Sequence, residues 1–378
     1  MSDAIKFMWR QRTPLVLCVG LFVISMSASA MQWSGYAKTF GVHTQIGEDS
    51  LQQWQTAARI MADSSLSEHL DWQVHYELLA VLSSERHPLL NGALDANQNS
   101  EYRWRDLNRE VNGSALDEQT RLYQNLDRAY LHWALAEGDL TLGRQAITFG
   151  SSRFVSPADV LLPLGLGALN EEYRQGVDGV RYQHNWSALH QWDMGVIHHD
   201  DQPLVYVRGL QALEQANLEW LVTQLPNGEL VSLGLQGAIG QAGAWAEYAY
   251  AAEGGDYHKA TFGVDYSLRE DLFVQSEWHF NGAANWLEKT GQAATGVYLL
   301  SEHYWMASLQ WQATPLISHG LSVYQNLDQR SGFWRSQTDV SWADDIISQL
   351  GVYGGSGARD SEFSHESWVV YVSLNGYF

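Results

Sequence analysis

Apolar and polar residues alternate with a period of two along most of this sequence, and this pattern most constrains its fold. In residues 70–78 the even-numbered positions are apolar and the odd-numbered ones polar, and residues 260–268 alternate in the same way. In residues 305–313 the odd-numbered positions are all Trp, Ala or Leu. Successive side chains of a β-strand point to opposite faces, so each segment predicts a strand with one apolar face.

We count eighteen such candidate strands, and the pattern continues without a break that would indicate a second domain. Their predicted starts lie near residues 32, 53, 69, 122, 139, 176, 190, 203, 216, 229, 243, 258, 271, 299, 317, 333, 346 and 366. Short turns rich in Gly, Asn and Asp separate many of them, as tight antiparallel hairpins require. The sequence therefore predicts an all-β fold.

The lengths of the connections indicate how these strands are arranged. The longest connections are residues 83–121, 150–175, 282–298 and 355–365, and each follows an odd-numbered strand, whereas connections after even-numbered strands are short. An up-and-down barrel that starts and ends in the periplasm has long loops outside and short turns inside. We therefore predict a transmembrane antiparallel β-barrel of about 18 strands, within a range of 16–18, with short periplasmic turns and long extracellular loops.

Composition is compatible with this fold, although it first suggests a soluble acidic protein. The mean hydropathy is -0.27, and 43 Asp and Glu against 22 Lys and Arg give a formal net charge of -21. In a membrane barrel only half of each strand faces lipid, so polar residues of the lumen lower the average. The excess of acids argues against a nucleic-acid partner, because phosphate binding needs clustered Lys and Arg. Nothing in the sequence indicates a cofactor.

The first thirty residues have the features of a secretory signal peptide. Lys6, Arg10 and Arg12 precede an apolar stretch at 15–26, and residues 28–30 read Ala-Ser-Ala, a typical cleavage motif. The stretch is shorter than the roughly 20 residues of a spanning helix, so we favour a cleaved signal peptide over an anchor. A single barrel is then expected at residues 31–378, which contain no cysteine.

The end of the chain resembles a known class of proteins. Trp368, Val370, Val372 and Leu374 share one face of the last predicted strand with Phe378, the final residue. This pattern resembles Gram-negative outer-membrane β-barrels, whose last strand ends in an aromatic residue that the assembly machinery reads. The resemblance implies an outer-membrane location, contact with lipid and lipopolysaccharide, and recognition of the strand ending at Phe378. Gly376 departs from the family pattern, which has a bulky apolar residue or Tyr at that position.

Strand number bears directly on function. A barrel of 16–18 strands leaves an aqueous channel, whereas side chains fill an eight-stranded one. We therefore expect a porin-like channel for small hydrophilic solutes or ions, and not an enzyme. A polysaccharide-export channel, an outer-membrane enzyme with a rim active site and a structural barrel remain alternatives. No Gly-x-Ser-x-Gly or His-Glu-x-x-His motif is present, and we interpret the His-rich stretch at 198–201 as a solvated loop, so we predict neither catalytic residues nor a metal site.

The connection at 150–175 is the most informative candidate for a pore constriction. It contains Ser156-Pro157, which resembles a helix start, and an apolar stretch at 160–169 that is unusual for a solvated loop. We expect this connection to fold into the barrel, with a cap outside the barrel or a contact with a neighbouring subunit as alternatives. Charged residues around it are the candidates for lining the pore: Arg128, Arg144, Arg153, Asp159, Glu171, Glu172, Arg174, Asp178 and Arg181. They could select ions, or they could pair with one another and brace the connection.

Residues 126–182 loosely resemble barrels of the alginate-export and related porin families. Those families also have about 18 strands and a Gly-Arg-containing strand before a constricting loop, as in Gly143-Arg144 here. The resemblance implies that Arg144 faces the pore, but the surplus of acids argues against an acidic polymer as substrate. The same surplus predicts a weak preference for cations if the acids line the lumen. Both a monomer and a homo-oligomer fit the sequence.

Overall fold

The computed structural model describes residues 31–84, 100–105, 107, 120–161, 172–253, 255–284, 299–364 and 367–378. The chain divides into the units Met1–Met31 and Gln32–Phe378, and all described strands belong to the second. The predicted signal peptide at 1–30 lies outside the described residues. Among the described residues, no helix has the length and apolarity needed to cross a membrane.

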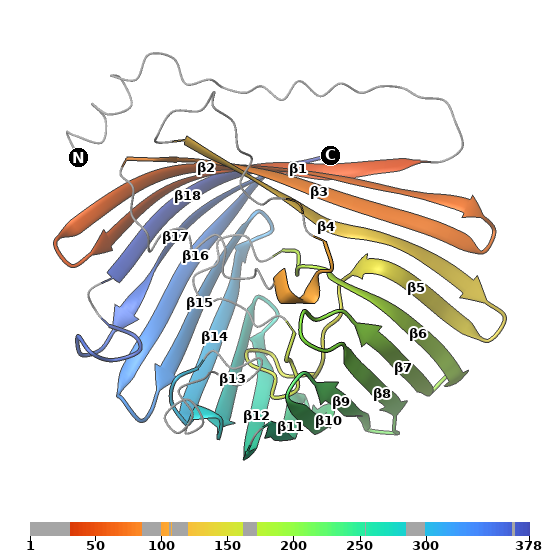
Figure 1. Ribbon diagram of the computed structural model, residues 1–378. Helices are drawn as coiled ribbons and strands as arrows, with labels where there is room; N and C mark the ends of the chain where they lie inside the picture. Colours follow the sequence, from red (N-terminus) through yellow and green to blue (C-terminus); the bar gives the residue numbers. More distant parts are fainter. Residues whose placement is uncertain are drawn as a thin grey trace. The chain divides into compact units, whose positions relative to one another are not determined.

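Eighteen antiparallel strands form one sheet that closes on itself, which confirms the predicted fold class (Figure 1). Each strand pairs with its neighbours in the sequence, and β1 also pairs with β18. The strands are β1 (Gln32–Ile46), β2 (Asp49–Ser67), β3 (Leu70–Ser83), β4 (Thr120–Leu135), β5 (Gly138–Gln145), β6 (Val177–Ser187), β7 (His190–Ile197), β8 (Leu204–Ala212), β9 (Ala216–Leu225), β10 (Gly228–Ile239), β11 (Ala242–Glu253), β12 (Asp256–Arg269), β13 (Leu272–Asn281), β14 (His303–Thr314), β15 (Ile317–Asn326), β16 (Ser331–Ala343), β17 (Ile346–Ser356) and β18 (Ser367–Tyr377).

The strand positions agree closely with the sequence pattern. The largest differences in the starts are four residues, at β2 (predicted 53, observed 49) and β14 (predicted 299, observed 303). The longest connections follow β3, β5, β13 and β17, and every connection after an even-numbered strand has two or three residues. One end of the barrel, here called the turn end, therefore has only short connections. All the long connections lie at the other, the loop end, together with two-residue turns after β1, β9 and β11.

The two faces of the strands differ as the alternation requires. On β10, Val231, Leu233 and Leu235 are 46, 53 and 46 % exposed, while Ser232 between them is 5 % exposed. The exposed positions point away from the barrel axis, where lipid would cover them, and the intervening positions form the inner face. The outer face is therefore a continuous apolar surface, and polar side chains gather inside.

The last residue of the chain completes the closure of the barrel. β1 and β18 pair from Tyr36 opposite Tyr377 to Ile46 opposite Ser367. Beyond them, Gly35 and Phe378 exchange two backbone hydrogen bonds of 3.0 and 3.1 Å. A side chain at Gly35 would meet the Phe378 ring and the carbonyl oxygen of Arg59. Closure leaves no unpaired sheet edge, which an open sheet in lipid would have.

Two adjacent positions in the middle of β15 test the assignment of the faces. We expect Leu321→Arg, on the outer face and 39 % exposed, to destabilise the barrel by about 2–4 kcal/mol if it lies near the bilayer midplane. Ser322→Arg on the inner face should cost far less, because water can solvate the guanidinium there. Urea unfolding in lipid vesicles, followed by intrinsic fluorescence, measures both. Equal losses for the two variants would contradict the assignment.

Candidate functional site

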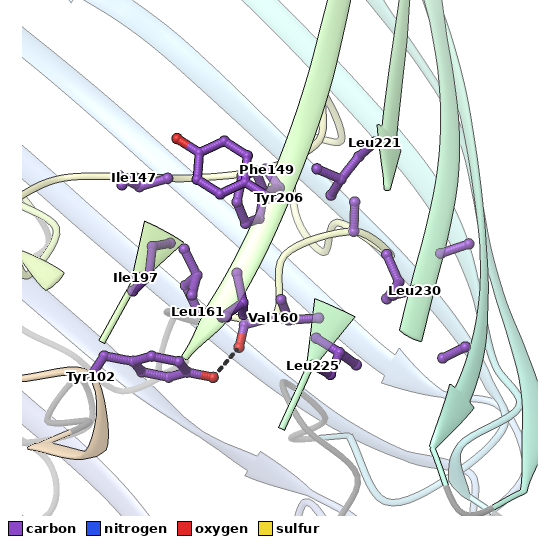
Figure 2. Packing of buried hydrophobic residues seen from close by; sticks show 14 of the residues in the cluster. Tyr102, Ile147, Phe149, Val160, Leu161, Ile197, Tyr206, Leu221, Leu225 and Leu230 are labelled. Atoms are coloured by element: carbon purple, nitrogen blue, oxygen red, sulfur yellow. Dashed lines mark hydrogen bonds between the residues drawn. The ribbon is translucent and has the colours of Figure 1, made fainter. Parts of the chain in front are cut away.

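The segment between β5 and β6 lies against the inner face of the barrel. Ile147, Phe149, Val160 and Leu161 are each no more than 2 % exposed. Figure 2 shows them packed together with side chains of the neighbouring wall. These wall residues include Tyr206 of β8, Leu221 and Leu225 of β9, Leu230 of β10 and Tyr257 of β12. Burial of each large apolar side chain contributes about 1.5–3 kcal/mol, so this contact holds the segment to the wall.

The carboxylate of Glu247 on β11 binds one turn of this segment. It accepts hydrogen bonds from the backbone N–H groups of Ser151 (3.0 Å), Ser152 (3.1 Å) and Ala158 (2.9 Å). The hydroxyls of Ser152 (2.8 Å) and Ser156 (2.6 Å) also donate to it. Glu247 is 3 % exposed, so these five donors replace the water that an ionised carboxylate otherwise needs.

Glu277 on β13 binds residues 153–155, which lie between the residues that Glu247 binds, in the same manner. Its carboxylate accepts the backbone N–H groups of Arg153 (2.9 Å) and Val155 (3.0 Å), and the indole N–H of Trp245 (2.8 Å). Glu277 is 1 % exposed. Two buried acids on the wall therefore hold residues 151–158 of one segment, largely through backbone donors. Such donors are present whatever side chains the segment carries.

The start of the bound segment depends on a glycine. Gly150 has a φ of +84°, a backbone conformation that residues with a Cβ rarely adopt. A Cβ there would also collide with the Ser156 hydroxyl and the Glu247 carboxylate. Its N–H donates to Glu219 of β9 over 3.1 Å. The glycine thus lets the chain turn closely against three acids of the wall, Glu219, Glu247 and Glu277.

The segment reaches the opposite side of the ring before β6 begins. Glu172 pairs with Lys38 of β1 and accepts the hydroxyl of Tyr377 over 3.2 Å. Tyr173 stacks on Tyr36 with a centroid distance of 6.0 Å, and the guanidinium of Arg59 lies 4.1 Å from the Tyr173 centroid. Burial and the neighbouring Glu172 carboxylate raise the pKa of Tyr173.

These contacts place the two described parts of the segment on different arcs of the barrel. Residues 150–158 contact acids of β9, β11 and β13, whereas residues 172–173 contact β1, β2 and β18. In the ring of eighteen strands, β1 and β10 are nine strands apart. Opposite arcs of the wall therefore hold the two parts.

A buried acid that the sequence analysis did not single out organises the second arc. Asp127 is 1 % exposed and pairs with Arg59 and Arg128, at 2.8 Å from Arg128 Nη1. It also accepts the N–H of Gly176 over 2.9 Å. Strict alternation would place Asp127 on the outer face, but a β-bulge between β3 and β4 leaves it unpaired and turned inward. In the sequence, Asp127 is an acid at a position of β4 where the alternation calls for an apolar residue, and this could have revealed the bulge.

Several of the predicted residues form ion pairs on or near the inner face. Arg174 binds Asp159 over 2.7 Å and so links the two parts of the segment. The backbone carbonyl of Arg174 accepts a hydrogen bond from Arg128. Arg181 of β6 binds Asp193 of β7 through two hydrogen bonds of 2.9 and 2.6 Å. Bracing by paired charges thus describes these residues well.

The Asp193 carboxylate has two further partners. Arg208 of β8 donates to it over 2.6 Å, and the Tyr206 hydroxyl donates over 3.0 Å. Asp193 is fully buried, and each of its partners lies on an inner face. Neither Asp193 nor Arg208 was among the predicted residues, because only the pairing of β6, β7 and β8 brings them together.

Arg144 and Asp178 form an ion pair with each other, and the pore-facing position that the family resemblance implies for Arg144 stays a prediction. Arg144 donates to Asp178 through hydrogen bonds of 2.7 and 2.9 Å. Gly143, with a φ of +115°, interrupts the regular alternation of β5, and Arg144 is only 4 % exposed whereas Leu142 on the outer face is 38 % exposed. The pair therefore lies buried at the loop end of β5 and β6. Residues 104–105 bind it through their backbone.

A second connection contributes to the interior. The 3-10 helix η2 (Ser100–Tyr102) precedes β4, and the Tyr102 hydroxyl donates to the carbonyl of Val160 over 3.3 Å. Arg103 donates to the carbonyl of Gly176 over 2.9 Å and to Asn125 over 2.8 Å. Residues 100–103 therefore pack against both described parts of the segment after β5. The sequence pattern gave no indication of this contact.

Two candidates remain. The guanidinium of Arg153 stays exposed and lies 5.3 Å from the Trp245 ring centroid, with no ion pair among the described residues. Glu171, another predicted residue, lies outside the described residues. Within the described ranges, no group of three or more His, Cys, Asp or Glu side chains could hold a metal ion. In the stretch at 198–201, the His198 imidazole lies 3.4 Å from Asp200 and the His199 imidazole lies 3.6 Å from Glu101.

Comparisons with known proteins identify the fold. The sequence matches no protein-family model and no curated protein. Similar solved structures include Acinetobacter baumannii OccAB4, with 11 % identity and a TM-score of 0.56 over 93 % of this chain and 99 % of that one. Pseudomonas aeruginosa OccK5 (OpdH) has 9 % identity and a TM-score of 0.60 over 93 and 99 %. P. aeruginosa OpdK, solved with vanillate, has 8 % identity and a TM-score of 0.56 over 92 and 98 %.

Glu247→Gln tests whether a wall carboxylate holds the segment. The amide keeps the shape of the carboxylate but turns an NH2 group toward hydrogen-bond donors. Buried N–H groups of the segment then lose an acceptor, which costs about 1–3 kcal/mol. We expect amide hydrogen exchange at residues 151, 152 and 158 to become roughly 10–100-fold faster, while the strands stay protected. Glu270→Gln, at an exposed turn, is the control. Unchanged exchange in Glu247→Gln would show that apolar contacts alone hold the segment.

Proposed function

We propose that this protein is an outer-membrane channel through which small hydrophilic solutes and ions diffuse. The observation that carries the proposal is a closed ring of eighteen strands with an apolar outer face and a polar inner face. A ring of this size encloses more space than the side chains of its strands fill. OpdK, which shares the fold, is known in a structure with vanillate, a small organic molecule, and this supports a solute of similar size.

The segment after β5 is, on this proposal, the constriction of the channel. Its described parts are bound to opposite arcs of the inner wall, which supports a course through the lumen rather than a cap outside. The ion pairs at Asp127, Asp159 and Asp193 hold the narrow region in a fixed shape. Because each of these acids is paired with arginine, they contribute little net charge to passing ions. The weak cation preference expected from composition therefore depends on the exposed acids.

The orientation and partners follow from the same proposal. The turn end would face the periplasm and the loop end the cell exterior, with lipopolysaccharide around its rim. The strand that ends at Phe378 would be the part that the barrel-assembly machinery reads. An apolar outer face is also compatible with a homo-oligomer. No contact among the described residues specifically favours the polysaccharide-export or rim-enzyme alternatives.

Conductance of the purified protein in planar lipid bilayers tests the proposed function. We expect discrete, long-lived current steps in potassium chloride, because the ion pairs of the wall hold a water-filled lumen in a fixed shape. Protein that inserts, as judged by protease protection in vesicles, but gives no current steps would contradict the proposal.

Arg153→Glu tests whether the segment lies in the path of the ions. The variant replaces an exposed positive charge with a negative one, and the backbone bonds of residue 153 to Glu277 stay available. We expect the reversal potential in a salt gradient to move toward that of a cation-selective channel. Arg330→Glu, in the turn between β15 and β16, makes the same charge change outside the segment and should move it less. Equal shifts would place residue 153 away from the narrow region.

A further inference from the structure

One part of the inner wall, at the turn end, makes no contact with the described residues of the segment after β5. A cavity of about 560 Å³ lies there against strands β12–β16. Its inner-face lining consists mostly of amide, hydroxyl and charged side chains, with one aromatic ring: Phe273, Gln310, Ser322, Arg335, Gln337 and Asp339. It is separate from the ion pairs of Asp127 and Asp193, which lie on β2, β4 and β6–β8.

The polar side chains of this cavity hold one another in place. Asp339 accepts hydrogen bonds from the amides of Gln337 and Gln349, each over 2.8 Å. Arg335 donates to the Gln337 carbonyl over 3.0 Å, and the Tyr371 hydroxyl donates to the same atom. The side chains are therefore fixed before any ligand arrives, which lowers the entropy cost of binding.

A glycine keeps the cavity open. Gly320 occupies an inner-face position of β15, paired with Gln310 of β14 and Gln337 of β16. A Cβ at this position would meet no atom within 4 Å. The backbone does not require a glycine here, because Gly320 is not among the residues with a positive φ. The missing side chain instead leaves room between the two glutamines.

We propose that this cavity binds a neutral polyhydroxylated ring, such as a sugar unit, as it passes through the channel. This inference rests on the proposed channel function and names the class of its solute. Amides and hydroxyls both donate and accept hydrogen bonds, as sugar hydroxyls do, and the Phe273 ring offers an apolar surface to the face of a sugar. The charged lining is nearly balanced, since Arg269 and Arg335 offset all but one of the charges of Glu270, Asp271 and Asp339, so the cavity has no strong preference for an ion.

Current recordings with maltotriose test the proposal. We expect the wild-type channel to show transient blocks whose frequency rises with maltotriose concentration. A polyethylene glycol of the same hydrodynamic size has ether oxygens that accept but do not donate, so it should give blocks at least about tenfold less often, as loss of paired hydrogen bonds predicts.

Gly320→Leu fills the cavity and is the sharpest variant, because its side chain points into empty space and the fold should persist. We expect maltotriose blocks to fall by about tenfold or more, with single-channel conductance in salt alone changed much less. Ala307→Leu adds three carbons, against four in Gly320→Leu, to the outer face of the adjacent strand β14 and should leave the blocks unchanged.

The outcomes separate the two proposals. A channel that conducts ions but shows equal blocks by maltotriose and polyethylene glycol overturns the sugar site and leaves the channel function standing. Retained maltotriose blocks in Gly320→Leu also overturn it. Absence of any conductance overturns the channel function itself.

Discussion

Backbone hydrogen bonding is the constraint on which the rest of this structure depends. In lipid an unpaired N–H or C=O group costs several kcal/mol, so strands can cross a membrane only if each pairs on both sides. The eighteen strands meet this requirement by closing between β1 and β18, down to the bonds between Gly35 and Phe378. Closure then determines whether each position carries an apolar or a polar side chain, because alternate residues of every strand must face lipid and the residues between them must face the lumen.

The lumen imposes a second requirement, because charges placed there are partly removed from water. The wall meets it in two ways. Asp127 and Asp193 are buried against arginines of neighbouring strands, whereas Glu247 and Glu277 accept mainly N–H and hydroxyl groups of the segment after β5. The second arrangement couples the fold of the wall to that of the segment, since neither carboxylate would be stable in its buried position without these donors. These four buried acids therefore serve structure.

Much of the fold could be predicted from the sequence, and much less of the site. Strand positions and loop parity followed from local alternation and turn residues, which depend on near neighbours. The charged residues around 126–182 were recognised as a group, but their partners were not, since Asp193, Glu247 and Glu277 lie on other strands. Arg144 was singled out, but its pairing with Asp178 follows only from the register of β5 against β6. In β9 and β10, apolar residues occur on the inner face as well as the outer one, as Leu221 and Leu230 show. This pattern in the sequence could have indicated that another segment covers the inner wall there.

The sequence by itself determined that this chain forms a barrel of about eighteen strands with long loops at one end. Period-two alternation and the turn residues encode that result locally, one hairpin at a time. Only the tertiary structure decided which acids meet which arginines, how the bulge turns Asp127 inward, and where Gly320 leaves a cavity. These features arise where residues distant in the sequence approach across a closed ring. The distance between two such residues depends both on the register of the strands and on the number of strands in the ring. A local sequence pattern specifies neither the register of distant strands nor the closure of the ring.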